Sequence, residues 1–241
     1  YTLLLSKGAN PNAKDLYGDT PLHITTMTGT DTKVLQILVD AGADFNERNK
    51  KGVTPLALSV ERGDIEQIIF FAKQGADINA EDMEGNTPLT RALHSKLEII
   101  KALINASNIS SRDSYGNTPL HVGILNKADI SKVRFLIENG SEVNARNRNG
   151  DSPLFICVQQ NNRQVGELLL SKGADVFASN TENYSPLRLA LSAGGEVQDW
   201  ILTSEVLKAT DGIGNTPLHY ASEWKLDNAV AILLEKGAKH D

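Results

Sequence analysis

One proline context recurs along the chain and limits what the chain can fold into. Seven of the eight prolines follow Thr or Ser and precede Leu. They are Pro21, Pro55, Pro88, Pro119, Pro153, Pro186 and Pro217. Their successive separations are 34, 33, 31, 34, 33 and 31 residues. A regular period of about 20–50 residues is typical of a stack of repeated units and not of a single globule.

Each unit is predicted to contain two short helices and a loop. The Thr or Ser hydroxyl can cap the first helix, and proline suits the first helical position because its missing N–H has no partner there. A turn follows, for example at Gly63 or at the pair Gly194 and Gly195. The second helix has apolar residues at helical spacing and ends at a glycine such as Gly75. Helices this short are unstable alone in water, so the units must stack to shelter their apolar faces.

The boundaries of the repeats follow from the proline spacing. We expect residues 1–19 to be the end of a preceding unit, so that the natural protein continues upstream. The full units are then residues 20–53, 54–86, 87–117, 118–151, 152–184, 185–215 and 216–241. Together they are predicted to form one all-α domain over residues 1–241.

Two of the units are shorter than the others. The series of separations occurs twice, so residues 20–117 and 118–215 align without a gap at an offset of 98. The third and sixth units have Asn105-Ala106-Ser107 and Thr203-Ser204-Glu205 where their neighbours have Gly-Ala-Asp, and they lack the glycine that ends the second helix. Two interpretations remain open. One is a hinge or pocket between units three and four and between units six and seven, and the other is neutral drift with local repacking.

The repeated unit resembles the ankyrin repeat. Residues 216–221 read Thr-Pro-Leu-His-Tyr-Ala, which matches the Thr-Pro-Leu-His-x-Ala signature of that family. The Gly-Ala-Asp segments at 42–44, 75–77 and 173–175 match its second half. The resemblance covers the whole chain and implies an ankyrin-repeat solenoid of stacked helix-turn-helix units with protruding loops. Ankyrin arrays generally bind other proteins and are not usually enzymes, so it also implies an interaction module whose protein or peptide partner is unknown.

Composition excludes several classes of partner and compartment. The chain has 24 Lys plus Arg against 30 Asp plus Glu, a net charge of −6, so it lacks the basic excess that binding to nucleic acid requires. Its apolar runs are far shorter than the ~18–20 residues of a membrane span, so we expect no membrane insertion. The one cysteine, Cys157, cannot form an internal disulfide, which favours a reducing compartment. We expect a cytoplasmic monomer.

The residues that could carry chemistry have simpler structural explanations. His23, His121 and His219 recur in the same register, too far apart for one metal, and each is predicted to bond the adjacent Thr and the next loop. Cys157 falls at a small, buried helix position, where a thiol is inert. Carboxylates such as Asp64, Glu66, Asp77, Glu81, Asp82 and Glu84 are interpreted as solvated charges. We predict no catalytic residue, no cofactor and no metal site.

The resemblance also implies where a partner binds. The contact positions of the family are the residues beside the loop glycine and the exposed end of the first helix. Carried over to this chain, they give the candidates Leu16, Tyr17, Met27, Lys50, Lys51, Arg62, Met83, Tyr115, Leu125, Arg148, Tyr184, Ile213 and Trp224. Loop tips have no structural need for large apolar residues, whereas interface cores are rich in Tyr, Trp, Met and Arg.

Two hypotheses about function follow. The first is a non-catalytic scaffold that binds a protein or peptide along the concave surface of loop tips and inner helices. The alternative is a targeting or regulatory arm of a larger protein, such as an enzyme, a channel or a secreted effector.

Overall fold

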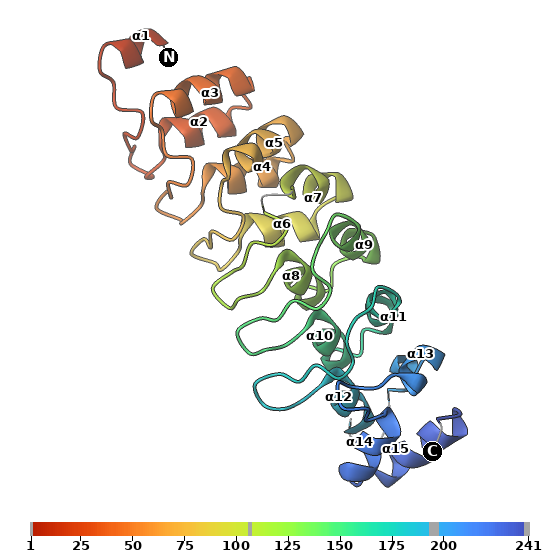
Figure 1. Ribbon diagram of the computed structural model, residues 1–241. Helices are drawn as coiled ribbons and strands as arrows, with labels where there is room; N and C mark the ends of the chain where they lie inside the picture. The colour runs from red at the N-terminus through yellow and green to blue at the C-terminus, as the bar shows by residue number, and fades with distance from the viewer. Residues whose placement is uncertain (1, 106–107, 193–197, 239–241) are drawn as a thin grey trace. The chain divides into compact units, whose positions relative to one another are not determined.

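The structure is a computed structural model that describes residues 2–105, 108–192 and 198–238, and within these ranges it contains helices and no strand (Figure 1). The first helices of the successive pairs are α2 (Pro21–Met27), α4 (Pro55–Arg62), α6 (Pro88–His94), α8 (Pro119–Leu125), α10 (Pro153–Gln159), α12 (Pro186–Ser192) and α14 (Pro217–Glu223). The second helices are α3 (Thr32–Asp40), α5 (Ile65–Gln74), α7 (Leu97–Leu103), α9 (Ile130–Glu138), α11 (Arg163–Ser171), α13 (Ser204–Lys208) and α15 (Asp227–Glu235). The short helix α1 (Thr2–Ser6) precedes the pairs, and a 3-10 turn, η1 (Asp199–Ile201), precedes α13.

The recurring prolines begin the first helices, as the sequence predicts. Each of the seven is the first residue of its helix. The preceding hydroxyl caps the helix: Thr54 Oγ1 accepts the N–H of Ala57 at 3.2 Å, and Ser152 Oγ accepts the N–H of Phe155 at 3.2 Å. The predicted all-α class and the helix-turn-helix unit are therefore confirmed. The turn predicted at Gly194 and Gly195 lies outside the described residues.

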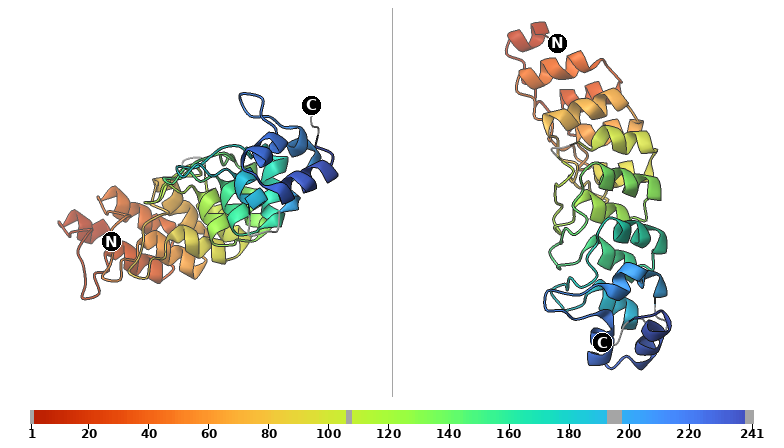
Figure 2. Two further views of the ribbon diagram at one scale, coloured as in Figure 1. Left: turned by 90° about the horizontal axis from the view of Figure 1, so that it is seen from below. Right: turned by 45° about the vertical axis from the view of Figure 1, so that its right-hand side comes forward.

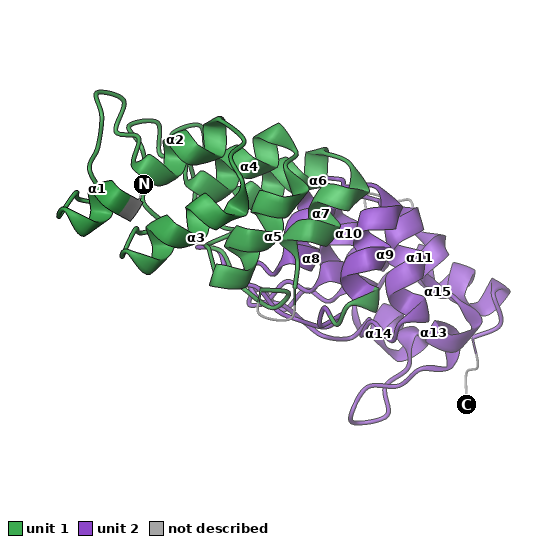
Figure 3. Cartoon of the chain, turned by 90° about the horizontal axis from the view of Figure 1, so that it is seen from above, with its two compact units in different colours: residues 1–113, 138–140 green, residues 114–137, 141–241 purple. Residues whose placement is uncertain are grey.

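The chain divides into two compact units (Figure 3). Unit 1 comprises residues 1–113 and 138–140, and unit 2 comprises residues 114–137 and 141–241. In unit 1, α2, α4 and α6 pack side by side, and so do α3, α5 and α7. In unit 2, α8, α10, α12 and α14 pack in sequence order, and α11 packs against both α10 and η1. The assignment of residues 1–241 to a single domain stays a prediction.

Leucines after the prolines form the centre of the packing. The residues Leu22, Leu56, Leu89, Leu120, Leu154 and Leu187 are all 0% exposed. Second helices contribute fully buried residues such as Leu35, Ile68 and Ile100. Because these side chains lie between neighbouring helices, each pair depends on the next for its core. In each unit the loops project from the layer of first helices, away from the second helices (Figure 2).

The sixth pair departs from the pattern. Its second helix, α13, has 5 residues, against 9 in α11 and 10 in α5. It ends at Ala209 in an extended conformation, whereas α5 ends at Gly75 with a φ of 82°. The third pair also lacks the terminal glycine, and α7 ends at Ile104 in an extended conformation, with Ala106 and Ser107 outside the described residues. The predicted absence of the helix-ending glycine is confirmed for both.

A tryptophan replaces the missing helical turn in the sixth pair. Trp200, on η1, lies against Gly166 in the middle of α11 and is buried. A Cβ on Gly166 would be 2.3 Å from two ring atoms of Trp200. The indole N–H donates to Asn161 Oδ1 at 3.2 Å. A glycine inside a helix is therefore required here by a neighbouring ring.

We predict that Gly166→Ala destabilises unit 2 by about 1–3 kcal/mol, because the new methyl overpacks against Trp200. Replacing a glycine inside a helix by alanine normally stabilises a protein by about 0.5–1 kcal/mol. A decrease in the free energy of unfolding would therefore be diagnostic of the contact. Urea denaturation followed by circular dichroism measures the change, and Gln164→Ala, exposed on the same helix, is the control. A Gly166→Ala variant as stable as the parent would contradict the contact.

Candidate functional site

Six of the loop tips are closed by an Asp or Asn that lies three residues before a tip residue of positive φ, which is glycine in five of them and Asn183 in the other. In the first loop, Asp15 Oδ1 accepts the N–H of Tyr17 at 2.8 Å and that of Asp19 at 2.9 Å. The same pair of bonds forms in other loops, at Asn49, Asp82, Asn147, Asn180 and Asp211. The backbone of the tip is therefore held by a side chain within its own loop. Sequence analysis missed these anchors, although their constant spacing from the tip residue is a signal that could have revealed them.

Neighbouring tips are also bonded to each other. In unit 1, the N–H of Lys50 donates to Tyr17 O at 3.0 Å, and the N–H of Met83 donates to Lys51 O at 2.9 Å. In unit 2, the N–H of Arg148 donates to Tyr115 O at 2.9 Å. These bonds use the backbone groups of the tips and not their side chains. Candidate residues from adjacent loops thus become spatial neighbours.

Some of the tip glycines are required for more than their conformation. Gly150 has a φ of 77°, and a Cβ there would lie 3.0 Å from the backbone N of Thr181 in the next loop. Gly18 and Gly116 have the same positive φ and equally close neighbours, at 2.8 Å from Lys50 N and 2.9 Å from Arg148 N. Gly214 also has a positive φ, of 91°, but has nothing within 4 Å.

The structure places most of the predicted contact residues in solvent. We call the loop tips and the exposed ends of the first helices the tip surface. In unit 1, the side chains of Leu16 (86% exposed), Tyr17 (74%) and Met83 (79%) stand out from it. Lys50, Lys51 and Arg62 are exposed as well, whereas Met27 is half-buried. In unit 2, Tyr115, Leu125, Arg148, Tyr184 and Ile213 are exposed, and Trp224 is half-buried.

Trp224 and Tyr184 belong to a cluster of rings joined by an arginine. The guanidinium of Arg188 lies 4.6 Å from the ring centre of Tyr184 and 5.3 Å from that of Trp224. Tyr220 stacks on Trp224 with centroids 4.8 Å apart, and Phe177 contacts Tyr220 at 5.7 Å. We call these five residues the Trp224 cluster. Sequence analysis missed Arg188, Tyr220 and Phe177, although the i, i+4 spacing of Tyr220 and Trp224 on one helix could have linked those two.

The Trp224 cluster is anchored to a loop tip through Tyr220. Its hydroxyl donates to Asp211 Oδ2 at 2.6 Å. This bond, together with N–H donors from Asn215 and Ile213, lowers the pKa of Asp211 to about 2. The same bond raises the pKa of Tyr220. The phenol therefore stays protonated and the carboxylate ionised, which holds the loop against α14.

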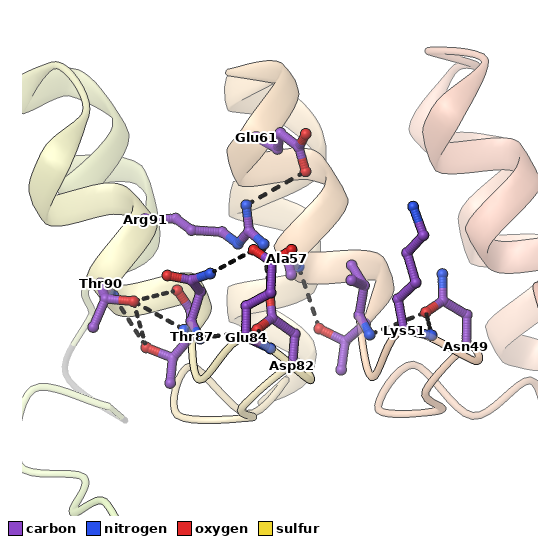
Figure 4. Close-up of polar contacts among 12 residues, drawn as sticks. Asn49, Lys51, Ala57, Glu61, Asp82, Glu84, Thr87, Thr90 and Arg91 are labelled. Atoms are coloured by element: carbon purple, nitrogen blue, oxygen red, sulfur yellow. Dashed lines mark hydrogen bonds and ion pairs between the residues drawn. The ribbon is translucent and has the colours of Figure 1, made fainter.

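One carboxylate is not the solvated charge that the sequence analysis expected. The side chain of Asp82 is 4% exposed and binds Arg91 of α6 at 2.5 Å (Figure 4). Arg91 also lies 3.6 Å from Glu61 of α4. Burial alone would raise the pKa of Asp82, but the hydrogen bonds from Arg91 and from two backbone N–H groups outweigh it, so the pKa falls. The solvated interpretation is wrong for Asp82 because tertiary packing brings Arg91 over the loop.

Two of the three recurring histidines, His23 and His121, have the structural role that was predicted for all three. The ring of His23 is fully buried, its Nδ1 accepts the N–H of Thr20 at 3.2 Å, and its Nε2 donates to Val53 O at 3.0 Å. His121 makes the equivalent bonds to Thr118 and Asp151. Each histidine thus ties a helix start to the following loop. His219 keeps the bond to Thr216, but its ring is exposed.

The structure gives no reactive role to the cysteine and offers no metal site among the described residues. Cys157 is fully buried, and burial raises the pKa of its thiol to about 12, which leaves no reactive thiolate. Among the described side chains, no group of three or more His, Cys, Asp or Glu residues could hold a metal ion. None of the helices in the described ranges has the length and apolar character needed to cross a bilayer.

We predict that Gly150→Ala costs more stability than Gly214→Ala. Both substitutions place alanine at a positive φ, which costs about 1–2 kcal/mol. Only at Gly150 does the new methyl press on the next loop, which adds about 1 kcal/mol by weakening the bond from Thr181 N to Asn149 O. Urea midpoints of the two variants give the comparison, and equal losses would count against tip-to-tip coupling.

We predict that His23 makes folding sensitive to acid. Burial lowers the pKa of His23 from its ordinary value of 6.5, despite the bond to Val53 O. As pH falls through about 6.5, the unfolded chain takes up a proton that the folded chain excludes, so the free energy of unfolding decreases. The loss between about pH 7.5 and about pH 5.5 should therefore be smaller in His23→Gln than in the parent. His94→Gln, at an exposed position, is the control, and equal losses in all three proteins would refute the role of His23.

Comparison with known proteins identifies the repeat. A family model described as "Ankyrin repeats (3 copies)" matches residues 1–82, 63–147, 108–180, 125–206 and 154–241, which together cover the whole chain. The mouse B-cell lymphoma 3 protein homolog is 28% identical over 190 residues, which are 76% of this chain and 42% of that protein. Human Rabankyrin-5 is 28% identical over 238 residues, 98% of this chain and 18% of that protein.

A solved structure has the same fold. The crystal structure of the ankyrin repeat domain of Bcl-3, described as a unique member of the IkappaB protein family, aligns with a TM-score of 0.66 and 25% identity. The match covers 90% of this chain and 99% of that one. The chain spans less than half the length of the two curated relatives. On the repeat model alone, which matches along the entire sequence, the chain belongs to the ankyrin-repeat family.

Proposed function

We propose that the chain is a non-catalytic scaffold that binds a protein or peptide through its tip surface. Ankyrin repeats are generally protein-interaction modules, and the proposal assigns this activity to particular residues. The observation that carries it is the exposure of large apolar side chains, such as Leu16, Tyr17, Met83 and Ile213, on loops whose backbones are already bonded. Such residues add nothing to the fold and cost solubility, so their use is in contact with a partner.

The bonded loops make such binding efficient. Association costs free energy because loops and side chains become ordered at the interface. In unit 1, the N–H of Lys50 is fixed to Tyr17 O and the N–H of Met83 to Lys51 O, so little backbone freedom remains to be lost. Tyrosine also has few rotatable bonds for its contact area. A stack of bonded loops therefore presents ordered anchors before the partner arrives.

Charges on the tips supply orientation. Lys50 and Lys51 are exposed in the first full repeat, residues 20–53, and Arg148 is exposed in the corresponding fourth repeat, residues 118–151. Exposed acidic residues such as Glu84 and Glu182 lie on other tips. A partner with a complementary alternation of charge would be steered into one register. Its affinity would fall as the salt concentration rises.

A second candidate function is that of a targeting or regulatory arm in a larger protein. It is favoured by the length of the relatives, of which this chain covers 42% and 18%. Both candidate functions use the same tip surface. They differ in whether the repeats act as a scaffold by themselves or bring the bound partner to another part of a larger protein. A cytoplasmic location and a monomeric state stay predictions.

We predict that alanine substitutions on the tip surface weaken binding to the partner. The partner is first recovered by affinity capture with the full-length protein and identified. Tyr17→Ala, Met83→Ala and Tyr115→Ala should then each lower its affinity by about 1–2 kcal/mol or more if these side chains are anchors. Isothermal titration calorimetry measures the change. Ile69→Ala is the matched control, because Ile69 is an exposed apolar residue on the second helix α5.

If the affinity is unchanged in all three tip variants, the proposal is refuted. So would a loss in Ile69→Ala as large as the losses in the tip variants. In either case the partner would be held by another surface of the repeats.

A further inference from the structure

A cavity of about 660 Å³ opens in unit 2 beside the second helices of the fifth and sixth pairs. It lies outside the tip surface. Its walls are the end of α11, the segment 173–177 that follows that helix, and residues between Thr203 and Thr210 around α13. Its volume is within the usual range of ligand sites, about 300–1,000 Å³. We call it the α11–α13 pocket.

The pocket results from the shortness of the sixth unit. The ring of Trp200 covers the middle of α11 at Gly166, and α13 contributes only residues 204–208 beyond it. After Ala209 the chain is extended, where other pairs continue to a left-handed glycine. The space beside the last turn of α11 is therefore left open. A hinge or pocket between units six and seven was one of the two interpretations left open by the sequence, whereas this pocket lies between units five and six.

A change at residue 177 accompanies the opening. In other units an asparagine at this position bonds the next unit: Asn144 donates to Gly173 O at 3.0 Å and accepts the N–H of Asp175 at 2.9 Å. The unit after Phe177 has no Gly-Ala-Asp segment to receive such a bond. Phenylalanine occupies that position instead, and it is one of the residues that line the pocket. A bridging amide has thus been replaced by an apolar wall.

The walls combine an apolar floor with an acidic rim. Val176 and Val206 are buried, while Leu170 and Phe177 are half-buried and accessible from the opening. Glu167, Asp175 and Glu205 are exposed at the edge. None of the described residues that line the pocket is Lys, Arg or His. The lining therefore suits a ligand with an apolar stem and a positive end.

The carboxylates of the rim are only partly paired within the chain. Glu167 forms an ion pair with Arg163, whose Nε lies 2.7 Å from Glu167 Oε1. Asp175 Oδ1 accepts the N–H of Phe177 at 2.8 Å. The backbone N–H of Glu205 and the hydroxyl of Ser204 donate to Glu205 and lower its pKa. Asp175 and Glu205 form no ion pair among the described residues and can accept a cation from outside.

We propose that the α11–α13 pocket binds an arginine side chain of a partner protein. The methylene stem would lie on the apolar floor, and the guanidinium would reach the carboxylates of the rim. Arginine suits the site better than lysine because its guanidinium is planar, offers several donors and is less strongly hydrated than an ammonium group. The site is independent of the tip surface, so either proposal can fail without the other.

The test uses the 241-residue chain and a probe that mimics arginine within a polypeptide. N-acetyl-arginine methylamide is titrated into the ¹⁵N-labelled protein, and backbone amide shifts are recorded by NMR. The largest shifts should occur at Ala174, Val206 and Ala209, with saturation in the millimolar range. The uncharged analogue N-acetyl-norleucine methylamide should leave these amides almost unchanged. Free arginine, with charged termini, should bind no better than the blocked probe.

Two variants connect the shifts to the pocket. Asp175→Asn/Glu205→Gln should weaken binding about two- to fivefold for each carboxylate removed, the usual effect of an exposed ion pair. Glu223→Gln/Glu235→Gln removes the same charge from exposed positions outside the pocket and should leave the affinity unchanged. Ala209→Leu should narrow the pocket and weaken binding, with the fold checked by amide shifts elsewhere in the spectrum.

Several results would overturn the proposal. One is the absence of shifts at the pocket amides, and another is equal binding of the norleucine analogue. Shifts confined to Tyr184, Arg188, Tyr220 and Trp224, the members of the Trp224 cluster that do not line the pocket, would assign the probe to the tip surface instead. Tighter binding of free arginine than of the blocked probe would indicate a small-molecule site and not a docking site for a partner protein.

Discussion

The structure depends on the mutual burial of helices that are too short to be stable alone. A seven-residue helix such as α6 cannot persist in water without tertiary contacts. Its Leu89 is buried only because α4 and the rest of its own pair cover it. Backbone bonds between loop tips and the bond from His23 to Val53 O keep successive pairs in register. Burial supplies the stabilisation, and the polar bonds align each pair with the next one in the chain.

The same arrangement explains why the loops can carry function. At the first tip, Asp15 satisfies the N–H groups of Tyr17 and Asp19, and the carbonyl of Tyr17 is used by the next loop. Because backbone bonds hold the tip, the identity of its side chains is not constrained by folding. Leu16, Met83 and Ile213 can therefore be apolar and exposed without weakening the stack. The fold separates residues that hold the loop from residues that are free to make contacts.

The irregular sixth unit shows how a repeat can gain a local site. Loss of the Gly-Ala-Asp segment shortens α13, and Trp200 fills part of the space by packing on Gly166. The remainder stays open as a cavity with Phe177 in its wall. These three changes are coupled because each involves the interface between the same two pairs. Where the repeats are regular, an asparagine such as Asn144 bonds the next repeat at this interface.

The sequence alone was sufficient for the helical repeat, its proline starts and its buried leucines, because these depend on spacing within one unit. The positions of exposed tip residues such as Tyr17 and Met83 could also be predicted, since loop tips project whatever their neighbours are. Contacts between one repeat and the next could not be predicted from the sequence. Three features depend on residues from different helix pairs or loops. They are the ion pair of Asp82 with Arg91, the Trp224 cluster and the pocket beside α11. Only the tertiary structure decides such pairs, because the packing of one repeat on the next is what brings them within reach.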